Sequence, residues 1–505
     1  MALSSILIIV IIVFSAVILA LVARLLWRKS QQAVADRYHD IRYEKYSRMI
    51  DETVADEPAA GSGAGIVKQV GDEEVLETLL RGKLGYFKGE DRSRVAAKLK
   101  DIGLTEDYKK RLSSPDPVKR ARSLEVLGEL RMVDLADRFL QGLKDDDGDV
   151  RLTAARGLAN LIDELKTTGV NDDRTGPLIE ALVLLIEESE RWPVRRIAGI
   201  IAGIGPDAID PLMIELRSSK GDVRALAADI LGAIGDQKAC DRLIASLSDP
   251  ETDVRARAAT ALGVLGNAKA VKPLIKAAQD EAWPVRARAA KSLGRIGDQI
   301  AVRPLAQLLK DRQWWVRRNA GYALSAIGEP GLEMLEKNLS NPDPYAAERA
   351  LEVLEETGRI SAFVHELGSE RTKTRNRAVA LLVAIGRIGG LAPIIEATGE
   401  TADDRVIVSL IEVWRELTEH LAETLASGEK QAEIKAIEST NKIAYSFVLE
   451  NIGSYKARKI PDIDTSLAEI DKNMAKIKQA IGHLKQDIDP ELRDEAAAAF
   501  NFMER

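Results

Sequence analysis

The residue types that most often carry catalysis are few in this sequence and are not grouped. The four histidines, His39, His365, His420 and His483, lie far apart, and Cys240 is the single cysteine. A zinc site needs several closely spaced Cys or His ligands, and a nucleophilic cysteine needs a base beside it. The glycines follow no phosphate-loop or nucleophile-elbow pattern. We therefore expect no catalytic residue, no metal site and no cofactor, and we interpret Cys240 as a packing residue.

Arginine and tryptophan residues, unlike the histidines and the cysteine, are grouped in the sequence and indicate a binding site. Between Asp280 and Arg318 nine basic side chains stand against four acidic ones, in a chain whose formal net charge is -7. Both residue types anchor protein interfaces, and arginine binds carboxylate and phosphate groups. The candidate partner-binding residues are Trp283, Arg288, Lys291, Arg295, Trp314, Trp315 and Arg318. They predict a site for an acidic or phosphate-bearing protein segment; a solvated basic face, and tryptophans that only fill gaps, are the alternatives.

The composition favours many small aliphatic contacts over one large core. The chain has 505 residues, of which 46% are hydrophobic and only 4% aromatic, and a chain of this length is too long for one compact domain. Its 79 acidic residues outnumber 72 basic ones, so we expect no nucleic-acid partner.

One sequence motif recurs at a period of thirty-one residues. It reads DVRARAATALGVLG from Asp253, PVRARAAKSLGRIG from Pro284 and WVRRNAGYALSAIG from Trp315. Alignment on its Val-Arg pair finds nine units, at Val118, Val150, Val194, Val223, Val254, Val285, Val316, Tyr345 and Thr374. Apolar residues at helical spacing predict two helices in each unit, the second beginning near the pair, with glycines such as Gly235, Gly266, Gly297 and Gly328 ending helices. Alanines at equal phase would let successive units pack closely as a solenoid.

These repeats resemble the HEAT family, in particular the HEAT-like repeats of the phycobilin-lyase type, over residues 73–399. The resemblance implies an all-α, right-handed solenoid of helix pairs, which binds partners along a concave face lined by the second helices. It also implies a ladder between units, made by an Asp ending the first helix and an Arg opening the second. The matching pairs are Asp145 with Arg151, Asp249 with Arg255, Asp280 with Arg286 and Asp311 with Arg317. The pattern lapses at Ser189 and Ser218, which precede Arg195 and Arg224.

The same resemblance supplies an alternative function, because HEAT-like repeats occur in phycobilin lyases and in a di-iron hydroxylase that acts on a modified lysine. The hydroxylase carries its iron on several His-Glu pairs. This chain has one such pair, His365-Glu366, and one pair cannot form a two-metal site. We therefore favour a protein-binding scaffold, with a HEAT-like lyase or other modifying enzyme as the alternative.

An apolar segment near the N-terminus predicts a membrane anchor. Ile6 to Ala23 holds eighteen residues of which only Ser15 is polar, which is enough to span a bilayer. The basic residues that follow it closely are Arg24, Arg28, Lys29, Arg37, Arg42, Lys45 and Arg48. The positive-inside rule then predicts a single-pass protein, with its N-terminus outside and its body in the cytoplasm, as in a bacterial inner membrane.

The predicted domains are an anchor over 1–29, a juxtamembrane segment and flexible linker over 30–71, the solenoid over 72–399 and a helical module over 400–505. The module shows heptad-like stripes at Ile407, Leu410, Trp414, Leu417 and Leu421, at Ile434, Ile437, Asn441, Ala444 and Val448, and at Leu467, Ile470, Met474, Ile477, Ile481, Leu484 and Ile488. Bundles and coiled coils share this pattern. We favour a bundle within one chain, and a homo-oligomer formed through these helices stays open.

Overall fold

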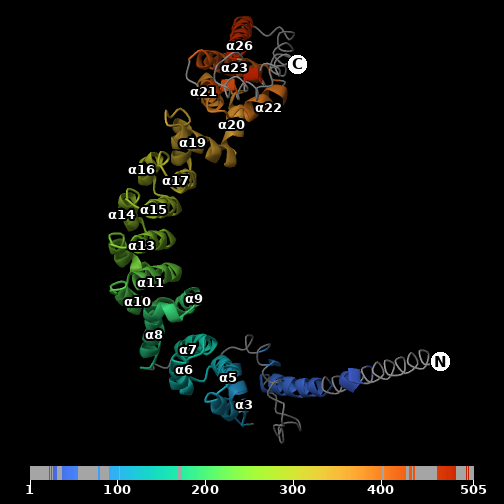
Figure 1. The fold of residues 1–505 in the computed structure, drawn as a ribbon, viewed down its shortest axis with the longest axis vertical. Coiled ribbons are helices and arrows are strands. Elements are labelled where there is room, and N and C mark those ends of the chain that lie inside the picture. The colour runs from blue at the N-terminus through green and yellow to red at the C-terminus, as the bar shows by residue number, and fades with distance from the viewer. Residues whose placement is uncertain are drawn as a thin grey trace, which may run out of the picture. The chain divides into compact units, whose positions relative to one another are not determined.

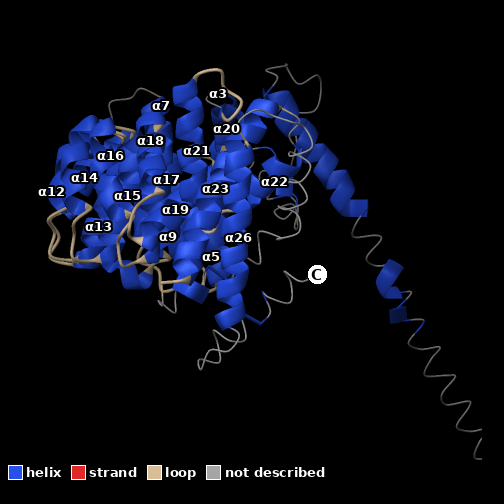
Figure 2. Cartoon of the chain, turned by 90° about the horizontal axis from the view of Figure 1, so that it is seen from above, coloured by secondary structure: helices blue, strands red, loops and turns tan. Residues whose placement is uncertain are grey.

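The computed structural model consists of helices and connecting loops in the part of the chain that it describes, as Figure 2 shows. That part comprises residues 90–168 (without 102), 173–400, 403–427 and 463–484, a helix over 37–54, and short pieces within 22–30, 75–83, 432–437 and 496–499. The predicted all-α fold is confirmed there. The predicted span Ile6 to Ala23 lies outside the described residues except for Val22.

Contacts divide the chain into two compact units, Met1–Ile234 and Gly235–Arg505. The labelled α-helices of the first unit are α3 (Glu90–Asp101), α4 (Leu104–Arg111), α5 (Pro117–Glu129), α6 (Ala136–Gly142), α7 (Gly148–Thr167), α8 (Thr175–Val183), α9 (Val194–Ile204), α10 (Ile209–Glu215) and α11 (Gly221–Ile234). Those of the second unit are α12 (Cys240–Ser246), α13 (Thr252–Leu265), α14 (Val271–Ala277), α15 (Trp283–Ile296), α16 (Val302–Leu308), α17 (Trp314–Ile327), α18 (Glu329–Asn338), α19 (Pro344–Glu356), α20 (Arg359–Glu366), α21 (Thr372–Arg387), α22 (Ala392–Glu400), α23 (Asp404–Leu425) and α26 (Asp464–Leu484).

The predicted second helices are the odd-numbered ones from α5 to α21. Each begins within two residues of its aligned repeat position, so the predicted helix starts are confirmed. In two weak repeats, the position aligned from the sequence lies one residue before the position that corresponds to the buried valine of the other repeats. Val118 and Tyr345 are both 57% exposed, whereas Val254 and Val316 are fully buried. In α19 the buried position falls on Ala346, which lies two residues after the helix start at Pro344, as Val316 lies two residues after the start of α17 at Trp314.

Glycines end the second helices as predicted. Gly266 follows α13 with φ 67° and Gly297 follows α15 with φ 77°, both left-handed, and their amides donate to carbonyls four residues back. Gly328 also has a positive φ, but its ψ of -149° places it outside the left-handed helical region. A side chain at these positions would strain the backbone.

The second helices of the middle repeats pack closely because the residues between them are small. Helices α13, α15 and α17 lie side by side in one layer, with α14 and α16 in the other (Figure 1). Ala259 and Ala290 are fully buried, and a Cβ built on Gly294 would lie only 2.6 Å from Cα of Ala323. The expected close approach through alanines and glycines is confirmed.

Within the described residues, Val194–Glu215 is long and apolar enough to cross a membrane. It is not one continuous α-helix, since α9 ends at Ile204, a 3-10 turn covers Gly205–Ala208, and α10 starts at Ile209. Gly205 has a φ of 81°, and α9 packs against both α7 and α11. About a third (33%) of the apolar window of this segment is buried inside the structure, including Ile201 and Leu212.

In the C-terminal region, α23 and α26 pack against each other within the chain. Their buried stripes are Ile407, Leu410, Trp414, Leu417 and Leu421 on α23, and Leu467, Ile470, Met474, Ile477 and Ile481 on α26. Helix α23 also packs on α21, and its Ser409 Oγ donates to the main-chain oxygen of Leu367, the residue that follows α20. The first helix of the predicted module thus continues the repeat packing. Asn441, Ala444, Val448 and Ile488 lie outside the described residues.

Candidate partner-binding surface

One arginine near the start of a second helix joins two successive repeats. The Arg286 guanidinium donates from Nε and Nη2 to the Asp311 carboxylate at 2.7 and 2.9 Å. Its Nη1 donates to the main-chain oxygens of Asp280 and Glu281, both at 2.9 Å. The forked guanidinium therefore fixes the loop of its own repeat and holds the carboxylate of the next one.

The carboxylate partner lies one repeat further along than the predicted pairing placed it. Asp280 accepts two bonds from Arg255, at 2.8 and 2.9 Å, while Arg286 reaches only its main-chain oxygen. Likewise Asp145 pairs with Arg120, and Arg151 donates to the main-chain oxygen of Asp145. The six-residue step within a repeat places the arginine over the peptide carbonyl, whereas the carboxylate faces the preceding repeat. This corrects all four predicted pairs, because in each of them the arginine donates to the main-chain oxygen of its aspartate; the pairs are Asp145 with Arg151, Asp249 with Arg255, Asp280 with Arg286 and Asp311 with Arg317.

The side chains of these ion pairs are largely buried, and this burial affects their pKa values. Burial alone would raise the pKa of Asp311, but the hydrogen bonds from Arg286 and from the Gln313 amide lower it below its usual value. The same bond with Asp311 raises the pKa of Arg286 against the effect of burial. Both groups therefore stay charged throughout the physiological range.

The main-chain contact is more widespread than the carboxylate contact. Within the described residues, arginines that donate to carbonyls six and five residues earlier are Arg120, Arg151, Arg224, Arg255, Arg286, Arg317 and Arg375. The sequence prediction missed Arg120 and Arg375 and regarded Arg224 as a lapse. A serine six residues earlier, such as Ser218, accepts the same turn amide that an aspartate accepts. Serine or aspartate six residues before arginine is the signal that would have found them.

Three tryptophans remain exposed at the starts of two neighbouring helices. Trp283 at the start of α15 is 41% exposed, and Trp314 and Trp315 at the start of α17 are 43% and 53% exposed. The last two rings form an edge-to-face pair with centroids 4.7 Å apart. Trp192, which the sequence places in the same register, is buried beneath Arg151. It fills a gap between helices, whereas the other three do not.

Arginines surround the Trp314 ring. The Arg318 guanidinium lies 5.5 Å from the centre of Trp314 and 4.9 Å from that of Tyr322, and Arg349 lies 5.5 Å from Trp314. Tyr322 donates to Glu356 at 2.5 Å, and this bond raises the pKa of the Tyr322 hydroxyl. The aromatic-arginine surface is defined by Trp314, Trp315, Arg318, Tyr322 and Tyr345, with the buried Arg349 beside Trp314. Sequence reasoning missed Tyr322, Tyr345 and Arg349.

The remaining candidates line one face of α15. Arg288, Lys291 and Arg295 are exposed, at helical spacing, and among the described residues no carboxylate pairs with them. Arg318 is only partly exposed, since it lies between aromatic rings. The structure therefore divides the seven predicted residues between the packed helices α15 and α17.

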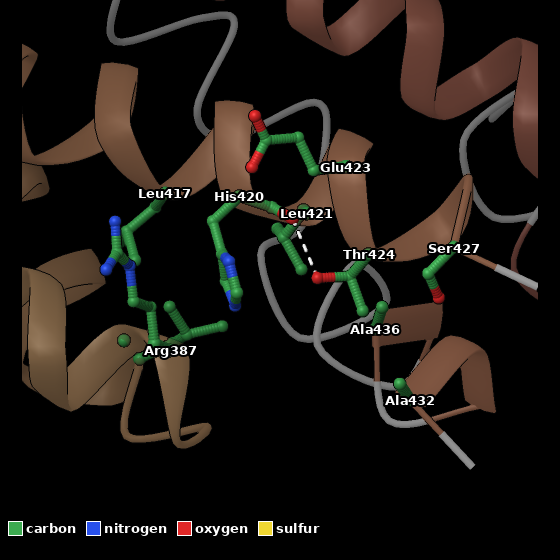
Figure 3. Close-up of a pocket in the computed structure, with 11 residues that line it drawn as sticks. Arg387, Leu417, His420, Leu421, Glu423, Thr424, Ser427, Ala432 and Ala436 are labelled. Carbon is green, nitrogen blue, oxygen red and sulfur yellow. Dashed lines mark hydrogen bonds between the residues drawn. The ribbon is translucent and has the colours of Figure 1, made fainter. Parts of the chain in front are cut away.

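A cavity of about 470 Å³ lies beside the C-terminal half of α23. Figure 3 shows His420 facing Arg387 across it, with Glu423 and Thr424 on the same helix. Burial and, less strongly, Arg387 lower the pKa of His420, which is therefore neutral near pH 7.

The other reactive residue types lie apart from these sites. Among the described residues, no group of three or more His, Cys, Asp or Glu side chains could hold a metal ion. Glu366 pairs with Arg377 at 3.4 Å. Cys240 is buried, which raises the pKa of its thiol, as expected of a packing residue.

Comparison with known proteins identifies the repeat class. A family model of HEAT repeats matches residues 105–200, 209–285, 241–325 and 271–355, and no curated protein matches the sequence. Similar solved structures include the complex of CpcE and CpcF of phycocyanin lyase from Nostoc sp. PCC7120, at 25% identity over 46% of this chain and 94% of that one, with a TM-score of 0.26. Kap95p bound to RanGDP is 13% identical over 86% of this chain and 72% of that one, with a TM-score of 0.40. Importin beta is 13% identical over 94% of this chain and 76% of that one, with a TM-score of 0.36. The family match runs from α4 to α19.

Proposed function

Since this chain is a HEAT-repeat protein, we propose that it is a scaffold that binds a protein partner on the layer of second helices, centred on the aromatic-arginine surface. One observation carries this proposal: Trp283, Trp314 and Trp315 stay exposed on helices whose valines, Val285 and Val316, are completely buried. Exposing so much aromatic area costs solvation free energy, and tryptophan beside arginine is typical of interface hot spots. A partner that covers these rings would recover that free energy.

The charge beside the tryptophans supports an acidic or phosphate-bearing partner. Arg288, Lys291 and Arg295 form an exposed basic row on α15 next to the aromatic-arginine surface. Such rim charges raise association rates and select oppositely charged partners. The expected interface therefore has an aromatic centre and a basic margin.

The proposal includes a membrane location. The sequence of Ile6 to Ala23 supports a transmembrane anchor, and the seven basic residues that follow support a cytoplasmic body. The scaffold would then recruit its partner to the membrane or steady a membrane complex from the cytoplasmic side.

Site-directed photo-crosslinking of the full chain in its own cells tests the binding surface. A photoreactive amino acid at Trp315 should crosslink a partner, which mass spectrometry identifies. The partner's affinity is then measured after Trp314→Ala, with Ile214→Ala as the matched control, because Ile214 is 69% exposed but lies on α10. We expect a loss of about 2 kcal/mol or more in binding from Trp314→Ala and none from the control. Equal affinities for the two folded variants would refute the proposal.

A further inference from the structure

Arg317 occupies the ladder position of α17 but lacks the carboxylate that its counterparts hold. Its Nη1 donates to the main-chain oxygens of Asp311 and Arg312 at 2.8 and 3.2 Å, as Arg286 does in the preceding repeat. The guanidinium is therefore fixed in the same place. No ion pair joins Arg317 to an acidic side chain among the described residues, whereas Arg286 binds Asp311 through Nε and Nη2.

The missing carboxylate is explained by one residue. Asn341 stands two residues before Asp343, the N-cap of α19, as Asp311 stands two residues before Gln313, the N-cap of α17. Its Oδ1 accepts from the Asp343 amide at 3.1 Å, as Asp311 Oδ1 accepts from the Gln313 amide. Its Nδ2 donates to Asn338 Oδ1 at 2.8 Å. The turn is therefore preserved while the negative charge is lost.

Arg317 is partly exposed and lies beside an aromatic ring. Its guanidinium lies 4.4 Å from the centre of the Tyr345 ring, and Tyr345 is 57% exposed. Trp315, two residues earlier, is 53% exposed. Arg151 differs, because its Nη2 donates to the main-chain oxygen of Arg191 and it lies over the buried Trp192.

We propose that Arg317 is an open rung of the ladder that binds an aspartate or glutamate side chain of the protein partner. Its Nε and Nη2 would donate to that carboxylate in the bidentate geometry of the Arg286–Asp311 pair, with Tyr345 beside it. This inference rests on the proposed scaffold function and specifies which group of the partner is recognised. A carboxylate is favoured over a phosphate because the chain itself uses this position for aspartate in three other repeats, those of Arg120, Arg255 and Arg286.

The substitution Asn341→Asp tests this inference directly, because the new carboxylate of the chain itself would pair with Arg317 and occupy the proposed site. The probe is a library of fluorescent peptides whose central residue is Asp, Asn or phosphoserine, titrated against the full chain. We expect central-Asp peptides to bind at least tenfold more tightly than their Asn counterparts. Asn341→Asp should remove that preference and raise the melting temperature. Asn341→Ser, which also loses the bond to Asn338 but adds no charge, should keep the preference.

Arg317→Lys is the second variant to be tested, since lysine keeps the positive charge but cannot bind a carboxylate through two parallel hydrogen bonds. We expect it to weaken central-Asp binding about tenfold without changing the melting temperature by more than Asn341→Ser does. Equal binding of Asp and Asn peptides, preference for phosphoserine over Asp, or full binding by Asn341→Asp would each overturn the inference. If Trp314→Ala still abolishes binding of the crosslinked partner in that case, the scaffold function stands and only the open rung is wrong.

Discussion

The arginine that opens a second helix determines how neighbouring repeats are joined. In Arg255 and Arg286 the guanidinium satisfies two main-chain oxygens and a carboxylate at once, with little exposure to water. A partly buried charge of this kind is stable only while its hydrogen-bonding partners are in place. Arg317 has the same backbone anchors but no carboxylate, so one residue type serves both cohesion and, as proposed, recognition.

Removing one ladder arginine should destabilise the repeat array. We expect Arg286→Ala to lower the free energy of unfolding by about 2–3 kcal/mol, because Asp311 loses its bidentate partner while it stays largely buried. Arg295→Ala on the same helix is the matched control, since Arg295 is exposed and has no carboxylate partner among the described residues. It should change the free energy by less than about 0.5 kcal/mol. Urea unfolding followed by circular dichroism measures both, and similar midpoints would contradict the role given to Arg286.

The ladder aspartates predict a dependence of stability on acid. Asp280 and Asp311 have lowered pKa values, since their hydrogen bonds from arginine outweigh burial. The unfolded chain therefore binds more protons than the folded one below pH about 4, so this stability is complete at neutral pH and is lost as the pH falls through the folded pKa values. Urea midpoints measured from pH 7 to pH 3 should fall most steeply below pH about 4. The double variant Asp280→Asn, Asp311→Asn should be less stable at pH 7 and show a shallower decline.

At the level of elements, glycines and alanines set the distance between second helices. Gly263, Gly294 and Gly386 each lie where a side chain would meet the next helix at less than van der Waals distance. The helices can interdigitate so closely only because these positions lack a Cβ. Because α15 and α17 pack closely, Trp283 and Trp314 lie in the same layer of helices.

Adding one methyl group should therefore have opposite effects at two helical glycines. Gly294→Ala places a Cβ 2.6 Å from Cα of Ala323, so we expect it to destabilise the chain by about 1–3 kcal/mol. Gly199→Ala on α9 has no atom within 4 Å of the new Cβ, and it should stabilise by about 0.5–1 kcal/mol through its helix propensity. Thermal and urea unfolding compare the two. A neutral Gly294→Ala would show that α15 and α17 can separate without cost.

For the molecule as a whole, each repeat contacts mainly the next, so stability adds up along the array. The ladder bonds, the glycine contacts and the packing of α23 on α21 all join adjacent elements. Helix α23 packs on α21 and on α26, so the array continues into the C-terminal helices. One continuous chain of neighbour contacts thus links the binding surface to the C-terminal helices.

The proposed anchor makes a prediction for the whole chain. Replacing Ile12 and Val17 with arginine places two charges in the predicted span, at about 2.5–3.5 kcal/mol of insertion free energy each. We expect the unchanged chain in the membrane fraction after alkaline extraction and the double variant in the supernatant. The matched control is Ile12→Leu, Val17→Leu, which should stay with the membrane. An unchanged chain that is fully extracted by alkali would contradict the anchor.

The sequence alone predicted the helix pairs, because burial of Val, Ala and Leu at helical spacing is a local property of each repeat. Helix starts at the Val-Arg pairs, left-handed glycines after α13 and α15, and the exposure of Arg288, Lys291 and Arg295 all follow from position within one helix. The buried stripes of α23 and α26 were predictable for the same reason.

Only the tertiary structure decided which side chains meet between repeats. The aspartate bound by Arg286 and the burial of Trp192 in contrast to Trp283 depend on the rotation and spacing of neighbouring helices. That geometry arises from packing across many repeats, which no single repeat sequence encodes. The open guanidinium of Arg317 is visible only when its loop and the next one are seen together.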